Sequence, residues 1–196
     1  MYQDFLMEIR KRPSDIEDMP NRAQDVLRCF GVNYLSNGVP IVEILASLGF
    51  KIYQSNLEPN GLSAYIVVDP QLNAVFQSNK IICVHIQDSI GHKKFALAHE
   101  LCHYIFDFNE DKDIHYYDTY FPRKNENEMQ EKRANKFAAN LLMPEKEFRK
   151  KVKEYRKIES KVNIISLLEE YFVVSTTAII RRLQELGISG YDNMET

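Results

Sequence analysis

The sequence FALAHELCHYIF at residues 95–106 decides the expected fold, because it fixes both the position and the face of one helix. Its apolar residues recur with a helical period, and His99 and His103 are four positions apart within it. Residues at this spacing lie one above the other on one face of a helix, so both imidazoles can bind the same ion. The pattern His-Glu-x-x-His is typical of zinc hydrolases. We therefore expect His99 and His103 to be metal ligands and Glu100, which is rotated around the helix, to be the catalytic base.

A catalytic zinc ion needs a third protein ligand, and residues 128–143 supply the candidates on a second predicted helix. Glu131 is the best of them. Asn135 follows one helical turn later, so it can bind the outer nitrogen of a ligating histidine and fix its tautomer. Spacing alone leaves Glu128 as the main competitor of Glu131.

The rest of the chain predicts an α+β fold. β-rich runs at residues 50–53, 64–68 and 81–86 indicate a small twisted sheet, antiparallel where connections are short, with Phe76 in a further short strand. We expect this sheet to pack against a zincin-like helical core, formed by the His-Glu-x-x-His helix and the third-ligand helix, with a C-terminal helical pair. Residues 1–20 are expected to be an N-terminal extension of uncertain order, and residues 21–196 a single metallopeptidase domain.

Composition and charge exclude several function classes. A formal net charge of −3 gives no electrostatic case for a nucleic-acid-binding protein as a whole. No apolar stretch is long enough to span a bilayer, and the N-terminus lacks the apolar block of a secretory signal. The three scattered cysteines argue against a disulfide framework. We therefore expect a cytoplasmic protein without membrane contact.

Residues 109–127 are polar and rich in tyrosine, and their length as a loop is typical of a functional or mobile segment. A loop beside the metal cleft can donate a hydrogen bond to the oxyanion that forms during attack, or can contact the substrate. The candidates for this role are His115, Tyr116, Tyr117 and Tyr120. Partner recognition and plain packing are the alternative interpretations.

Residues 95–104 and 131–144 together resemble the ImmA/IrrE family of gluzincin-like metallo-endopeptidases. The family pattern is close to FTLAHELGHY followed by ExxANxFAAxLLMP, and the second block matches here almost completely. Weaker similarity extends over residues 23–188. The resemblance implies that Glu131 is the third ligand of one Zn²⁺ ion. It also implies an anti-repressor role in a bacterium or phage, in which a helix-turn-helix repressor is cleaved to derepress mobile-element or stress-response genes.

One departure from the family pattern is Cys102, which stands where the family usually has glycine. A thiol is a possible zinc ligand. Cys102 falls on the apolar stripe of its helix, however, some way round from the two histidines, so we expect a buried and inert thiol.

Residues 162–188 resemble a helix-turn-helix unit, in which Ser175 caps a second helix that carries Arg181 and Arg182. DNA binding by this unit is a rival hypothesis, although the same apolar pattern arises if the helices close the peptidase domain, which we favour. The alternative function is a non-proteolytic, zinc-containing regulatory protein that binds a repressor or DNA.

Overall fold

The computed structural model describes residues 2–12, 14–32, 38–56, 63–108, 115–117, 126–158 and 161–191. Within these residues one mixed sheet is formed, with the strand order β1-β3-β2-β4. β3 pairs in parallel with β1 and antiparallel with β2, and β2 pairs antiparallel with β4. The strands are β1 (Lys51–Ser55), β2 (Ala64–Val68), β3 (Lys80–His85) and β4 (His115–Tyr117). The antiparallel β2–β3 pair agrees with the short connection between them.

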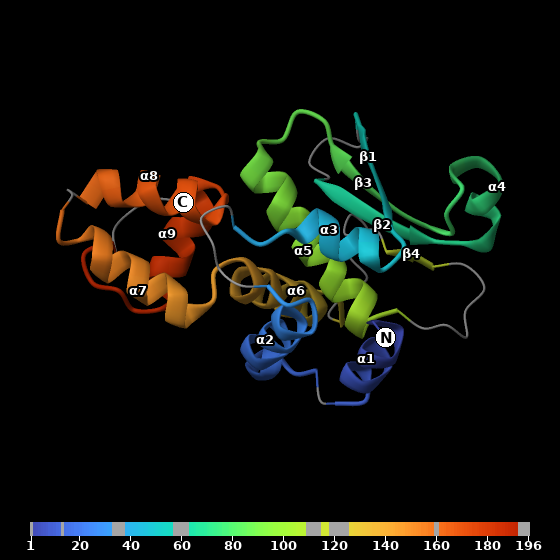
Figure 1. Ribbon diagram of the computed structural model, residues 1–196, viewed down its shortest axis with the longest axis horizontal. Helices are drawn as coiled ribbons and strands as arrows, with labels where there is room; N and C mark the ends of the chain where they lie inside the picture. Colours follow the sequence, from blue (N-terminus) through green and yellow to red (C-terminus); the bar gives the residue numbers. More distant parts are fainter. Residues whose placement is uncertain are drawn as a thin grey trace.

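Helices α5 (Ile90–Phe106) and α6 (Glu126–Leu142) form the centre of the molecule, and α5 lies between the sheet and α6 (Figure 1). α5 starts at Ser89, whose hydroxyl accepts a hydrogen bond from the His92 amide. α6 packs closely on its neighbours because Ala134 and Ala138, both fully buried, leave no bulk between the helices. This arrangement confirms the expected α+β fold, a small sheet against a zincin-like helical core.

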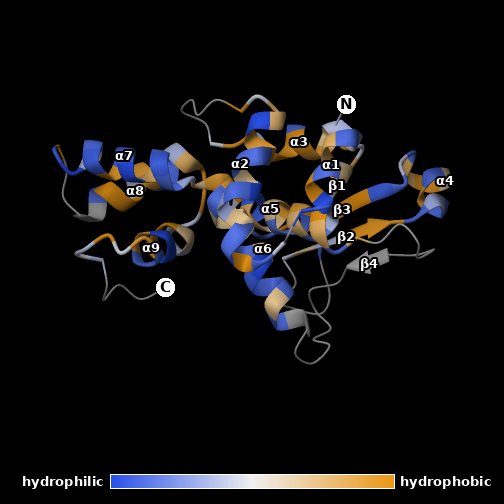
Figure 2. Ribbon diagram, turned by 90° about the horizontal axis from the view of Figure 1, so that it is seen from below, coloured by the Kyte–Doolittle hydropathy of each residue, from blue (hydrophilic) through white to orange (hydrophobic). Residues whose placement is uncertain are grey.

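Apolar residues gather along β2 and β3 and along α5 beside them (Figure 2). Ile66 and Ile82 pair across the two strands and are almost completely buried. Their β-branched side chains suit a pleated surface that is covered by a helix. The sheet therefore fixes the position of α5, on which the histidines lie.

The remaining helices surround this centre. α1 (Tyr2–Arg10) packs on α5, and α2 (Met19–Cys29) packs on α6. Between them lies a single 3₁₀ turn, η1 (Ile16–Asp18). The segment expected to be an extension thus contributes Leu6, Ile9 and Met19 to the same core. Tyr2, Phe5, Leu6 and Ile9 have the i, i+3, i+4, i+7 spacing of an amphipathic helix, so the helical period could have predicted this packing.

α3 (Ile41–Ser47) precedes β1, and η2 (Pro70–Leu72) and α4 (Asn73–Phe76) lie between β2 and β3. The expectation of a strand at Phe76 was therefore wrong. Asp69 accepts a hydrogen bond from the Gln71 amide at 2.8 Å, which starts a helical turn directly after β2. The left-handed backbone of Gln77 (φ 50°) then ends α4.

The C-terminal part comprises α7 (Glu145–Tyr155), α8 (Lys161–Phe172) and α9 (Thr176–Glu185). It lies beside the N-terminal half of α5 (Figure 1). Gly91 marks the contact, because a Cβ atom there would lie 2.5 Å from the Val174 backbone. Among the described residues, no single helix is long and apolar enough to cross a membrane. The helical segments Asn163–Phe172 and Thr176–Glu185 meet this length and apolarity only when they are taken together, and their axes are bent by 103° relative to each other.

Candidate metal centre

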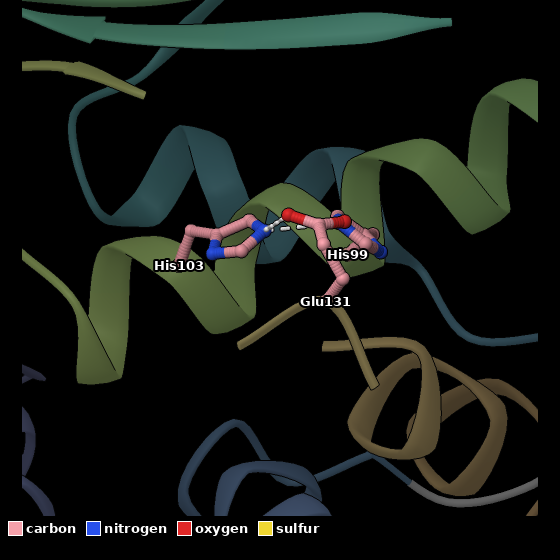
Figure 3. Close-up of side chains that lie close together, drawn as sticks. All are labelled: His99, His103 and Glu131. Carbon is pink, nitrogen blue, oxygen red and sulfur yellow. Dashed lines mark hydrogen bonds and ion pairs between the residues drawn. The ribbon is translucent and has the colours of Figure 1, made fainter. Parts of the chain in front are cut away.

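The side chains of His99, His103 and Glu131 converge between α5 and α6 (Figure 3). The helical spacing places both imidazoles on the face of α5 that meets α6, where they are 9% and 4% exposed. Their Nε2 atoms are 2.9 Å apart. The Glu131 carboxylate reaches both rings from α6, with Oε2 3.1 Å from His99 Nε2 and Oε1 3.4 Å from His103 Nε2.

Each imidazole is oriented by an acceptor on its outer nitrogen. Asn135 Oδ1 lies 3.1 Å from His99 Nδ1, and Asp107 Oδ2 lies 2.8 Å from His103 Nδ1. Because both partners are acceptors, each Nδ1 carries a hydrogen, and a ring that is neutral directs the lone pair of its Nε2 toward Glu131. Two lone pairs and a carboxylate in contact repel one another unless a cation lies between them.

The protonation equilibria of the metal-free site indicate the same preference for positive charge. Burial alone lowers the pKa of His103, but hydrogen bonds to Asp107 and Glu131 and the charge of Glu100 raise it to about 10. Burial raises the pKa of Glu131, but hydrogen bonds from His103 and His99 lower it to about 2. The site therefore holds a proton at neutral pH, in the place where a metal ion would bind.

The three residues fit a tetrahedral divalent ion. Zinc bonds of about 2.0–2.1 Å to nitrogen and oxygen separate neighbouring ligand atoms by roughly 3.3–3.4 Å. The contacts of 2.9, 3.1 and 3.4 Å among the three side chains are close to that spacing. With three protein ligands the fourth position is left to a water molecule or a substrate, as in catalytic zinc sites. The group can thus bind a metal ion.

Neither of the two alternative ligands joins this group. Glu128 is exposed and forms an ion pair with Lys132 at 2.6 Å, one helical turn away. Cys102 is fully buried in the hydrophobic core, and burial raises the pKa of its thiol well above the usual value. A protonated, buried thiol is a poor metal ligand, so neither side chain is placed to bind the ion.

Glu100 lies next to this group at the wall of a cavity of about 950 Å³, and only 2% of its surface is exposed. β2, α5, α6 and α9 all contribute to the cavity wall, and Ile16 of η1 borders it from the N-terminal segment. The wall includes Ser63, Ala64, His92, His99, Glu131, Asn135, Thr177 and Arg181. A carboxylate at this position can exchange a proton with a molecule bound in the cavity.

The candidates from the tyrosine-rich stretch are only partly described. His115, Tyr116 and Tyr117 form β4, a strand within the segment expected to be a loop, and pair with residues 66–68 of β2. Their side chains, and the whole of Tyr120, lie outside the described residues. Their proposed contact with the oxyanion or the substrate stays a prediction.

Asp107 and Arg133 belong to the site but were missed by sequence reasoning. Asp107 follows His103 by four positions, so the spacing that identified the two histidines could also have found it. Arg133 donates a hydrogen bond from Nη2 to Asp107 Oδ1, and this contact joins two helices. No local pattern in the sequence indicates such a contact.

Comparisons with known proteins show the family of this chain and its similarity in fold. The Peptidase M78 model, described as the IrrE N-terminal-like domain, matches residues 46–184. A solved Mycobacterium tuberculosis transcriptional regulator is similar in fold, with a TM-score of 0.57 and 17% sequence identity. The match covers 93% of this chain and 52% of the regulator, so this chain spans about half of its length. A search of curated proteins gave no match. The family match extends over more than half of the chain, which therefore belongs to the IrrE N-terminal-like domain family.

Proposed function

We propose that this protein is a zinc-dependent endopeptidase that cleaves a regulatory protein. The observation that carries the proposal is the convergence of His99 Nε2, His103 Nε2 and the Glu131 carboxylate on one point, beside Glu100 and an open cavity. Bound there, one zinc ion would supply Lewis-acid activation of a water molecule and of the scissile carbonyl. Asn135 keeps His99 in the tautomer that ligates.

Glu100 has the role of general base in this reaction. Its carboxylate takes the proton of the attacking water and then passes it to the leaving amine nitrogen. Burial of Glu100 beside the ligands keeps bulk water from competing for that proton. The reaction consumes one water molecule for each peptide bond that is hydrolysed.

An extended substrate fits the edge of β2. The His85 amide donates to the Ser63 carbonyl at 2.9 Å, so Ser63 faces β3. Backbone groups alternate in direction along an antiparallel strand, and those of Ala64 therefore point to the opposite side, where β4 lies. In the described part of the chain β4 pairs only with residues 66–68, and Ala64 borders the cavity. A peptide in the cavity can pair with this part of β2 as an added strand.

The proposed substrate is a helix-turn-helix repressor, and the reaction takes place in the cytoplasm. This specificity follows from the family resemblance. The free thiols of Cys29, Cys83 and Cys102 fit a reducing compartment.

Direct DNA binding by α9 is less favoured, because one of its two arginines, Arg182, is buried and engaged within the protein. Arg182 is 2% exposed and donates to Met143 O and Asn140 Oδ1. Arg181, on the exposed side, borders the cavity. α9 thus has the position of a cleft wall.

The proposal is tested with purified protein, zinc and the repressor that is encoded beside its gene. The wild type should cleave the repressor, and Glu100→Gln should retain one zinc ion per chain but lose cleavage. Glu128→Gln is the matched control, because it removes an exposed carboxylate outside the ligand group, and it should cleave normally. Full cleavage by Glu100→Gln would disprove the mechanism. An intact repressor in a tight complex with zinc-loaded wild type would favour the non-proteolytic alternative.

A further inference from the structure

A chain of contacts leads from His103 away from the cavity. His103 Nδ1 donates to Asp107 Oδ2 at 2.8 Å, and the Asp107 side chain is only 4% exposed. The other oxygen of this carboxylate, Oδ1, accepts a hydrogen bond from Arg133 Nη2. Asp107 therefore has one oxygen on the ligating ring and the other on a guanidinium group. This leaves its plane little freedom to rotate.

Arg133 is held in place from the side opposite Asp107. Its Nη1 lies 3.4 Å from the Ser14 carbonyl oxygen and 3.3 Å from Ser14 Oγ, and both oxygens accept from it. Its guanidinium carbon lies 5.8 Å from the centre of the Phe106 ring. With 14% of the side chain exposed, Arg133 is fixed by groups from two separate segments, the turn at Ser14 and the C-terminal end of α5. Rotation toward solvent would break these contacts together.

The segment that carries Ser14 is itself anchored at the C-terminal end of the ligand helix. Arg10 donates from Nε to the Ile105 carbonyl at 3.0 Å and from Nη2 to the Tyr104 carbonyl at 2.9 Å. These are carbonyls of the last helical turn, which lack partners within the helix. Leu6 and Ile9 of the same segment are buried in the core. Residues 2–18 lie before the family match, which begins at residue 46.

We propose that Arg133 is a positioning residue for the metal centre, which it supports by holding Asp107 against His103 while the N-terminal segment holds Arg133. The inference rests on the proposed zinc site and deepens it. Arg133 does not touch the ligand atoms and acts through Asp107. It fixes the direction of the His103 Nε2 lone pair, and its positive charge offsets negative charge on the buried Asp107 carboxylate.

The test is the zinc affinity of the full-length protein, measured by competition with a chromophoric chelator. Loss of an outer partner of a ligating histidine costs about 10–100-fold in metal affinity. Arg133 acts one contact further out, through Asp107, so Arg133→Gln should weaken zinc binding by about tenfold, the lower end of that range. Arg133→Lys should recover part of the loss, because it restores the charge but not the planar fork. Arg22→Gln is the matched control. Arg22 is 12% exposed and pairs with Asp25 at 3.0 Å, outside the cavity wall, and its loss should leave the affinity unchanged.

A spectroscopic readout separates positioning from general destabilisation. The cobalt-substituted protein reports ligand geometry through its visible absorption bands. Arg133→Gln should shift these bands relative to wild type, whereas Arg22→Gln should not. The double variant with Asp107→Asn should bind zinc no more weakly than Asp107→Asn alone, because both residues act through the same contact.

The outcomes distinguish a failure of the proposed zinc site from a failure of the positioning role of Arg133. A wild type that binds no zinc would disprove the proposed function, and the inference with it. A wild type that binds zinc, alongside Arg133→Gln of equal affinity and unchanged cobalt spectrum, would overturn the inference and leave the zinc site intact. Equal losses in Arg133→Gln and Arg22→Gln would also overturn it, since they indicate a general effect on folding. So would a further tenfold loss in the double variant, because Arg133 would then act by another route.

Discussion

Replacement of Arg182 by alanine should detach the C-terminal helices from the metal-binding core. The guanidinium group donates to Met143 O at 3.1 Å, to Asn140 Oδ1 at 2.8 Å and to Glu185 Oε2 at 2.6 Å. The variant leaves the first two acceptors buried without their donor, at about 1–3 kcal/mol each. Loss of one partner from a buried ion pair costs about 3–5 kcal/mol. We therefore expect the free energy of unfolding to fall by about 3–5 kcal/mol, a large part of the stability of a domain of this size.

Urea denaturation followed by circular dichroism measures this loss, and the melting temperature should fall by roughly 6–20 °C. Arg181→Ala is the matched control, since it removes the same side chain one position away, on the exposed side of α9. Its effect should stay within about 0.5 kcal/mol. Similar stabilities for the two variants would refute the reasoning, because Arg182 would then not join α9 to α6. The helix-turn-helix hypothesis would regain support if Arg182→Ala lost DNA binding at unchanged stability.

Two further predictions concern the ligands. Glu131→Gln should reduce zinc affinity strongly, by at least about tenfold, while Glu128→Gln should not, as measured by chelator competition; equal effects would contradict the ligand assignment. Zinc binding at pH 7 should release about one proton, because the pKa of His103 in the metal-free site is raised to about 10 and zinc must displace the proton on this ring. The apparent zinc affinity should therefore rise with pH up to about 10. Calorimetry in buffers of different ionisation enthalpy measures the number of protons released, and no release would show that His103 is neutral before zinc binds.

Features set by local periodicity could be predicted from the sequence. His99 and His103 share a face because four residues make slightly more than one helical turn, and this spacing is visible without a structure. The same rule predicted the contact of Asn135 with the outer nitrogen of His99, and the structure has it at 3.1 Å. The choice between Glu131 and Glu128 needed more than spacing. The family resemblance favoured Glu131, and the structure places it beside both histidines.

Features that depend on contacts between distant segments could not be predicted. Arg10 and Ile105 are 95 positions apart, and Ser14 and Arg133 are 119 apart, so no periodic pattern relates them. The strand expected at Phe76 shows a related difficulty. The short apolar run Ala74-Val75-Phe76 fits either element, and it continues the helical turn that the Asp69 cap starts at residue 70. Tertiary contacts and helix capping therefore determine the parts of the structure that the helical period does not predict.

The N-terminal segment and α9 have a common role around the metal centre. One supports His103 from behind through Arg133, and the other forms the cavity wall opposite β2. Residues 2–18 lie before the family match, which begins at residue 46, whereas α9 lies within it except for Glu185.

The central claim is tested most directly by crystals of the zinc-loaded protein, measured on both sides of the zinc absorption edge. We expect one anomalous peak per chain, bound by Nε2 of His99, Nε2 of His103 and the carboxylate of Glu131, with Glu100 facing the fourth position. A peak bound by Cys102 or Glu128, or no peak between α5 and α6, would contradict it.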